Sequence, residues 1–186
     1  MLSLYKVTKR YGPQTVFSNF SLDIPSGVRI SLMGASGCGK TTVLRLLAGL
    51  EEPDAGQAKR EGTISLVFQE DRLLNALTPM GNLRLVAGRG TSGWLENLLV
   101  RLGLEHSLGK SVSELSGGMK RRVAIARALA VNYDAILLDE PFRGLDPDAR
   151  KSSAQVILEE AQGKTILLVT HDLAEAGLMG TDVVRL

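Results

Sequence analysis

The stretch that decides the fold is Gly34-Ala35-Ser36-Gly37-Cys38-Gly39-Lys40-Thr41-Thr42. It matches the pattern G-x-x-x-x-G-K-[ST] at every fixed position. Apolar residues at 28, 30, 32 and 33 precede it and predict a short buried strand, and apolar residues at helical spacing over 41–50 predict a helix after it. A strand, a glycine-rich loop and a helix in this order are the context in which the pattern marks a phosphate-binding loop.

The residues of this loop suit an anion. Because Gly34, Gly37 and Gly39 lack a Cβ, the backbone can turn sharply and approach a ligand closely. Its N–H groups can then cradle phosphate oxygens, and the helix N-terminus adds the positive end of its dipole. In this pattern Lys40 reaches the β- and γ-phosphates, and the Thr41 hydroxyl holds Mg²⁺. The alternative, a glycine-rich turn that ends by chance in Lys-Thr, is disfavoured by the flanking strand and helix.

The composition bounds the class of protein. A chain of 186 residues with 44% hydrophobic and 23% charged residues is typical of one soluble globular domain. A net charge of +2 argues against nucleic acid as the main partner. The single cysteine excludes an internal disulfide and suits a reducing cytoplasm. The first residues lack signal-peptide features, and no apolar run approaches the roughly 20 residues that span a bilayer. We therefore expect any membrane part to come from another chain.

Hydrophobic patterning predicts strands that alternate with helices. Expected strands cover residues 3–7, 17–24, 28–33, 64–68, 135–138, 165–169 and 182–186. Expected helices cover 41–50, a segment opening at 78–79, 94–102, 119–131 and 146–162, with one short helix after 172. Expected connections are a loop at 51–56, a tight reversal at 59–62 and a flexible glycine-rich linker at 87–93. The alternation predicts a mostly parallel α/β sheet, which binds ligands at the carboxyl ends of its strands.

Two adjacent carboxylates follow a strand predicted to be buried on both faces. Asp139 fits a Mg²⁺ partner that acts through a water molecule. Glu140 fits the group that orients or deprotonates an attacking water. The alternative is an acidic pair that caps the next helix, but the phosphate loop upstream favours the catalytic interpretation.

The motifs together resemble those of an ABC-type ATPase, and the resemblance covers essentially the whole chain. They are, in order, 34–41, Gln69, Leu115-Ser116-Gly117-Gly118, Leu138-Asp139-Glu140-Pro141, Gly144-Leu145-Asp146 and His171. Residues 68–74 and 115–129 look most like ATP-binding subunits of bacterial nitrate, sulfonate and taurine importers. The resemblance implies a P-loop NTPase fold with a mostly parallel core sheet, a small antiparallel β subdomain and an inserted helical subdomain at about 72–133, all in one domain.

The resemblance also implies a role for each motif residue. ATP would be bound by residues 34–42, with Tyr11 stacked on adenine, although a strand-end tyrosine is a fair competing interpretation. Mg²⁺ would be held by Thr41, Gln69 and Asp139, and the catalytic residues would be Lys40, Gln69, Glu140 and His171. Ser116, Gly117 and Gly118 would bind the γ-phosphate held by a second subunit, since one chain cannot easily place both anion sites on one nucleotide. Asp146 would couple the two sites.

The function implied is ATP hydrolysis that powers uptake of a small solute. The implied partners are a second copy of the chain, transmembrane permease subunits and a substrate-binding protein, with no nucleic acid. The implied location is cytoplasmic, on the inner face of the cell membrane. A soluble ABC ATPase outside transport and a nucleotide-binding module with little hydrolysis remain alternatives.

Several positions depart from the family pattern. Met119 stands where the most common signature has Gln, and the anion contacts of Ser116 and the glycines do not depend on it. The segment 56–64 is short, so we expect the antiparallel subdomain to lack a hairpin. The sequence ends soon after its last strand, so we expect neither C-terminal helices nor a regulatory domain. Cys38 in the phosphate loop is expected to be either a reactive thiol or a small inert residue.

Overall fold

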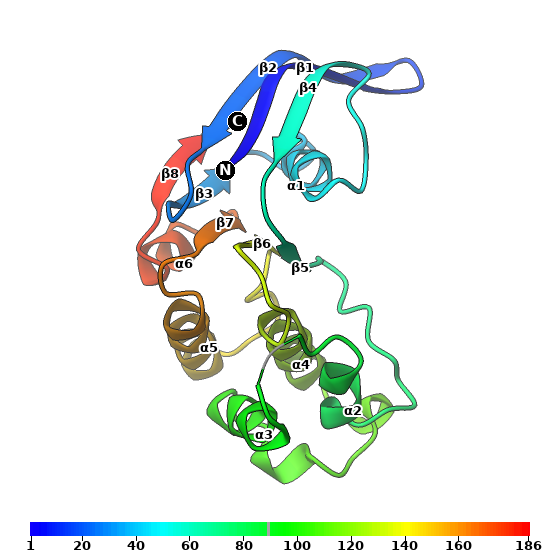
Figure 1. Cartoon of the computed structure of the whole chain (residues 1–186), viewed down its shortest axis with the longest axis vertical. Coiled ribbons are helices and arrows are strands. Elements are labelled where there is room, and N and C mark those ends of the chain that lie inside the picture. Colours follow the sequence, from blue (N-terminus) through cyan, green and yellow to red (C-terminus); the bar gives the residue numbers. More distant parts are fainter. Residues whose placement is uncertain (89) are drawn as a thin grey trace.

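The computed structural model describes residues 1–88 and 90–186. They form two β-sheets with helices between and below them (Figure 1). The α/β fold with a mostly parallel core sheet and a small antiparallel sheet is confirmed. Arg89, in the predicted linker, lies outside the described residues.

The smaller sheet is antiparallel and has the strand order β2-β1-β4. Its strands are β1 (Leu2–Tyr11), β2 (Gln14–Ile24) and β4 (Ala55–Arg60). The predicted reversal at 59–62 was wrong, because Lys59 and Arg60 continue β4 and pair with Ser3 and Leu2. A strand of polar residues, exposed or half-buried, has no hydrophobic alternation to reveal it.

The larger sheet is entirely parallel and has the strand order β5-β6-β7-β3-β8. Its strands are β3 (Arg29–Met33), β5 (Ile64–Val67), β6 (Ala135–Asp139), β7 (Thr165–Val169) and β8 (Asp182–Arg185). Every residue of β6 and β7 is buried, as the continuous apolar runs predict. The carboxyl ends of β3, β6 and β7 therefore lie side by side at one edge of the sheet.

Residues 1–88 and 90–186 include six α-helices. They are α1 (Lys40–Ala48), α2 (Pro79–Arg84), α3 (Ser92–Arg101), α4 (Gly117–Leu129), α5 (Pro147–Glu160) and α6 (Leu173–Leu178), with 3₁₀ turns at Glu105–Ser107 and Val112–Glu114. The predicted linker was wrong in its second half, because the Thr91 hydroxyl caps α3 by accepting a hydrogen bond from the Trp94 N–H. Helices α2, α3 and α4 lie together at the end of the molecule opposite the antiparallel sheet (Figure 1).

Two hydrophobic cores hold these layers together. One packs α1 between the antiparallel sheet and the parallel sheet, around Leu44, Leu47 and Leu137. The other packs the opposite side of the parallel sheet against α4, α5 and the helices below, around Leu98 and Phe142. Within 1–88 and 90–186, the structure contains no helix with the length and apolarity needed to cross a bilayer.

Candidate nucleotide-binding site

An open cavity of about 710 Å³ lies at the carboxyl ends of β3, β6 and β7. It is lined by residues of the phosphate loop, of the segments that follow β5, β6 and β7, and of the β1–β2 hairpin: Tyr11, Gln14, Val16, Ser36, Gly37, Gly39, Lys40, Thr41, Thr42, Gln69, Asp139, Glu140, Arg143, Val169 and His171. The structure thus brings all four residues with predicted catalytic roles to one cavity. Ligand binding at this edge is what a parallel α/β sheet favours.

The phosphate loop has the backbone conformation that its glycines predict. Gly37 and Gly39 have φ angles of 79° and 101°, in the region that glycine adopts readily. A Cβ on Gly39 would lie 2.4 Å from Cζ of Phe17, so the β2 strand also requires glycine there. The loop leads directly into α1, whose N-cap is Gly39. The first N–H groups of α1 are thus placed at the cavity, where they can bind an anion.

The Lys40 ammonium is held inside the loop. Its Nζ donates to the carbonyls of Gly34 and Ala35, at 2.8 Å each, and lies 3.8 Å from Sγ of Cys38. These three residues lie outside the cavity wall, whereas Ser36, Gly37 and 39–42 line it. A buried ammonium that is bound only by neutral groups is well placed to pair with an anion that enters the cavity.

Thr41 and Asp139 provide a pair of oxygen ligands. The Thr41 hydroxyl donates to Oδ2 of Asp139 at 3.0 Å, and Gln69 lines the same cavity. Burial raises the pKa of the Asp139 carboxyl, and the hydrogen bond from Thr41 opposes that rise. A hydroxyl, a carboxylate and an amide oxygen are hard ligands of the kind that Mg²⁺ prefers. The residues present therefore fit a Mg²⁺ ion.

Glu140 and His171 face each other across the cavity mouth. Nδ1 of His171 lies 3.3 Å from Oε1 of Glu140, and the histidine side chain is 74% exposed whereas that of Glu140 is 21% exposed. Glu140 has a φ of 45°, an uncommon conformation for a residue other than glycine. Its backbone N–H donates to the Val169 carbonyl at 2.9 Å. A strained residue fixed by such bonds is typical of functional sites.

Tyr11 lies at the rim of the cavity. Its side chain is exposed, its hydroxyl donates to Oε2 of Glu51, and the Lys9 ammonium lies 5.4 Å from the ring centroid. An exposed aromatic ring at the edge of a polar cavity can stack on a planar base. This position is compatible with the predicted adenine contact.

The predicted second anion site lies outside this cavity. Ser116 is the N-cap of α4, and its Oγ accepts from the Met119 N–H at 3.3 Å. Gly117 and Gly118 line a second open concavity of about 270 Å³, together with Gln69, Asp71, Arg121, Arg143 and Gly144. It adjoins the first cavity, because Gln69 and Arg143 line both. The phosphate loop and the N-terminus of α4 therefore open on two neighbouring concavities, and each begins a helix, where N–H groups can bind an anion.

Asp146 also lies outside the cavity, at the N-terminus of α5. Its Oδ1 accepts from the Ala149 N–H at 2.8 Å, and this bond lowers the pKa of the Asp146 carboxyl. Its structural role as a helix cap is therefore clear from the geometry. The predicted role of Asp146 in coupling two nucleotide sites involves a second subunit and stays a prediction.

Sequence reasoning missed four residues of the site and its support. Gln14, Val16 and Arg143 line the cavity, and Arg121 lies buried behind it. Arg121 stands in the run Lys120-Arg121-Arg122, which is typical of a solvated helix face. Arg121 lies four residues before Ile125 and therefore on the same, buried face of α4. This helical spacing could have indicated from the sequence that Arg121 is buried.

The comparisons with known proteins agree with this geometry. The ABC transporter family profile matches residues 17–143. An aliphatic sulfonates import ATP-binding protein of Pseudomonas fluorescens is 41% identical, over 97% of this chain and 71% of that protein. An Fe(3+) ions import ATP-binding protein of Mesorhizobium japonicum is 40% identical, over 94% of this chain and 54% of that protein. The chain thus spans between about half and seven-tenths of the length of these relatives.

Solved structures give the same result. A bacterial ABC transporter cassette in its dimeric form matches all of this chain and 94% of its own, with a TM-score of 0.88 and 31% identity. A dimeric post-hydrolysis state of the same cassette, bound to ADP and Pi, matches with a TM-score of 0.88 and 30% identity. The resemblance seen in the motifs and the P-loop NTPase fold are confirmed. Because the family profile covers more than half of the chain and these relatives align with nearly all of it, the chain belongs to the ABC transporter family, as an ATP-binding cassette.

Proposed function

We propose that two copies of this chain bind and hydrolyse ATP between them and so drive a separate membrane permease that imports a small solute. The observation that carries the proposal is that two anion-binding turns of one chain open on two different concavities. Lys40 lines the first, whereas Gly117 and Gly118 at the N-terminus of α4 line only the second. Two chains arranged head to tail about a two-fold axis can close each turn over the other chain's nucleotide. The dimeric state of the solved cassettes supports this arrangement.

The residues of the cavity can perform the binding steps. Tyr11 would stack on the base, and the N–H groups of residues 36–42 would cradle the phosphates. Lys40 would exchange the carbonyls of Gly34 and Ala35 for phosphate oxygens, which carry more negative charge. Thr41, Gln69 and Asp139 would hold Mg²⁺, which when bound neutralises charge on the phosphate oxygens.

The same cavity places a base for the hydrolytic step. The Glu140 carboxylate would orient a water molecule and accept its proton as the water attacks the γ-phosphate. His171, 3.3 Å from that carboxylate, would donate to a γ-phosphate oxygen and fix the direction of the glutamate. Ser116, Gly117 and Gly118 of the second copy would supply further N–H and O–H donors to the same phosphate, with Asp146 coupling the two sites.

The import role rests on the relatives. Their names assign them to the import of sulfonates and of Fe(3+) ions, and the cassette family works with membrane partners. Under this proposal the chain is peripheral on the inner face of the membrane, a permease is its membrane partner, and a substrate-binding protein belongs to the complete system. Residues 72–133, with helices α2 to α4, would form the helical subdomain that contacts the permease.

Hydrolysis measured against chain concentration tests the proposal. The specific activity of the purified chain with Mg-ATP is expected to rise with concentration, because each active site needs two chains. Glu140→Gln should lower the rate by roughly 100-fold or more while ATP still binds, since it removes the base. Phosphate release gives the rate, and a fluorescent ATP analogue gives binding. A chain that binds ATP but shows no hydrolysis at any concentration, with or without permease, would instead be a nucleotide-binding module.

A further inference from the structure

Arg121 on α4 is the most extensively bonded side chain behind the cavity. Its side chain is only 4% exposed. Its guanidinium donates, at 2.6–3.3 Å, to the carbonyls of Phe68, Gln69, Asp139, Glu140 and Pro141 and to the Asp71 carboxylate. Five acceptors are thus backbone carbonyls, which a rigid planar fork of N–H donors can bind together.

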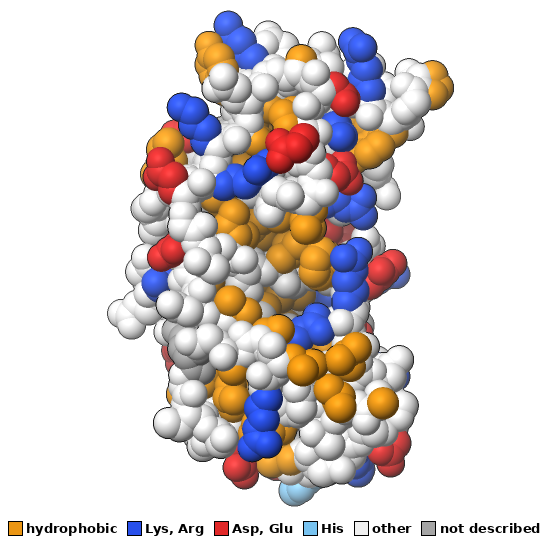
Figure 2. Space-filling model, turned by 45° about the vertical axis from the view of Figure 1, so that its right-hand side comes forward, with side chains coloured by type: hydrophobic (Ala, Val, Ile, Leu, Met, Phe, Trp, Pro, Cys, Tyr) orange, Lys and Arg blue, Asp and Glu red, His pale blue; other side chains and the backbone are white. Residues whose placement is uncertain are grey.

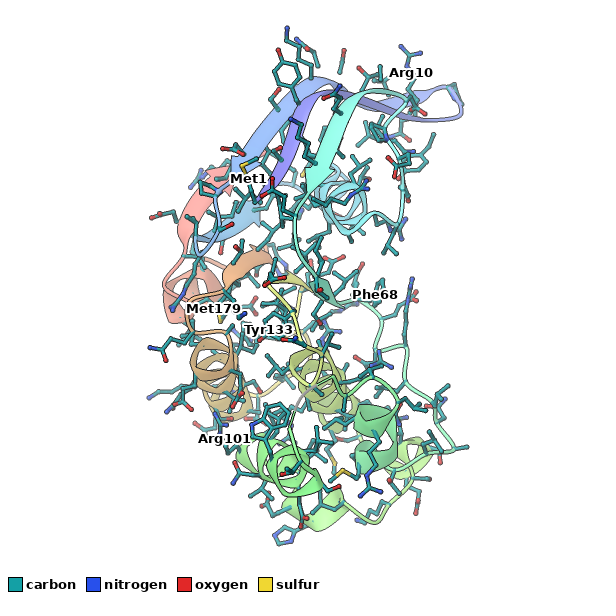
Figure 3. All side chains as sticks on the ribbon, viewed as in Figure 1. Met1, Arg10, Phe68, Arg101, Tyr133 and Met179 are labelled. Carbon is teal, nitrogen blue, oxygen red and sulfur yellow. The ribbon has the colours of Figure 1, made fainter. Side chains whose placement is uncertain are left out.

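These acceptors belong to two segments that carry site residues. One segment follows β5 and includes Gln69, and the other is the end of β6 with Asp139 and Glu140. Phe68, which begins the first segment, lies where the chain leaves the core sheet for α2 (Figure 3). A carbonyl past the end of a strand has lost its sheet partner, and burying it unpaired is costly. Arg121 satisfies carbonyls of both segments and so fixes the distance between them.

The neighbouring arginines of α4 show how specific this arrangement is. Arg127 donates to the carbonyls of Asp71 and Arg72, so it reaches only one of the two segments. Arg122 donates to the carbonyls of Leu102 and Gly103, away from both. Arg121 alone among these three joins the β5 and β6 ends.

We propose that Arg121 is a positioning residue that sets the spacing between Gln69 and the Asp139-Glu140 pair, and with it the Mg²⁺ ligands and the base. This inference rests on the proposed ATPase function. Arg121 does not line the cavity that holds Lys40, although it borders the concavity of Gly117 and Gly118. Its guanidinium bonds go to backbone carbonyls and to Asp71, so it acts through the backbone that it holds. Arg121 also lies four residues after Gly117, one turn into α4. One side chain therefore fixes to both segments the helix whose N-terminus would contact the second copy.

Measuring ATP affinity with and without Mg²⁺ distinguishes a role of Arg121 in positioning the Mg²⁺ ligands from a role in stabilising the fold. We expect Arg121→Gln to bind a fluorescent ATP analogue in EDTA within about threefold of wild type, since the phosphate loop is untouched. In Mg²⁺ the same variant should bind roughly 10-fold more weakly than wild type, the effect typical of lost support behind metal ligands. Its hydrolysis at saturating Mg-ATP should fall about 100-fold, as expected for a misplaced catalytic group.

Arg101→Gln is the matched control. Arg101 on α3 pairs with Glu159 and Glu160 of α5 at 2.6 and 2.5 Å, among the helices at the lower end of the molecule (Figure 3). It does not line the cavity. Its replacement should lower the melting temperature and leave the ratio of ATP affinities in Mg²⁺ and EDTA unchanged. Arg121→Lys keeps the charge with only three donors, so it serves as the second variant if Arg121→Gln does not fold, and the same shift in that ratio is expected.

The outcomes are distinct. If both Arg121 variants, corrected for their folded fraction by circular dichroism, keep the wild-type ratio of affinities and the wild-type rate, Arg121 is only structural and the inference is overturned. If the wild-type chain itself binds ATP without any Mg²⁺ effect and without hydrolysis, the proposed function fails and this inference fails with it. A shifted ratio in the Arg121 variants but not in Arg101→Gln supports the positioning role.

Discussion

Cys38 provides a residue-scale test of the cavity assignment. It is the one cysteine of the chain, and its Sγ lies 3.8 Å from the Lys40 ammonium. A bulky adduct on this sulfur would enter the space that the loop and Lys40 share. Alkylation is therefore expected to abolish ATP hydrolysis, and saturating ATP should slow labelling by about tenfold or more because only the free state reacts. Mass spectrometry follows labelling, with Cys38→Ser as the unreactive control. Equal labelling rates with and without ATP would show that nucleotide does not bind at this loop.

Much of the site at this scale was predictable because its residues follow signals of regular structure. Lys40 and Thr41 come after a strand and a glycine-rich loop, and Asp139 ends a wholly apolar strand. Arg121 was not predictable in this way, because its partners are backbone carbonyls of segments 18 to 53 positions away. A sequence pattern contains only the types of side chain. Contacts with distant backbone carbonyls depend on how the folded chain brings separate segments together.

At the scale of elements, the segment after β5 and the end of helix α2 both carry exposed apolar side chains. The Asn82 side chain on α2 bonds the backbone N–H and carbonyl of Leu74 and so ties the two together. The side chains of Leu74 and Leu85 are exposed, at 53% and 60%, whereas Leu73 packs against the core. Figure 2 shows hydrophobic side chains on the side of the molecule that carries these elements. We expect a permease segment to dock there.

Replacing Leu74 and Leu85 with Asp tests this docking surface. The double variant should be released from native membrane vesicles in a sedimentation assay, because a charged group in an apolar contact is costly. Its ATP binding in solution should match wild type, since both residues lie outside the cavity. Val100→Asp on α3, at a position 42% exposed, is the control and should stay bound. Retention of the double variant on membranes would place the docking surface elsewhere.

The elements themselves were predicted with unequal success, for a physical reason. Buried strands such as β6 and β7 can be predicted because their residues are almost continuously apolar. Strand β4 is polar, and it forms because its backbone pairs with β1, which hydrophobic patterning cannot reveal. The start of α3 was hidden by glycine and serine, although Thr91 is a residue type that commonly caps helix N-termini.

At the scale of the whole molecule, the two anion-binding turns open on two neighbouring concavities of one chain. Under the proposed function, a nucleotide held by the phosphate loop would have its γ-phosphate covered by the Ser116 turn of a second chain. ATP should then be the ligand that joins two chains, and hydrolysis should separate them. Under the proposed function, one chain holds only part of each active site.

The most direct test is the mass of the Glu140→Gln variant measured by light scattering with and without Mg-ATP. The chain has a mass of 20.0 kDa. We predict that saturating ATP doubles this mass, and that adding Ser116→Glu prevents the doubling while each chain still binds ATP, since a carboxylate at that turn repels the partner's γ-phosphate. A monomer that stays monomeric with ATP bound, or a dimer that forms regardless of Ser116, would contradict the composite site.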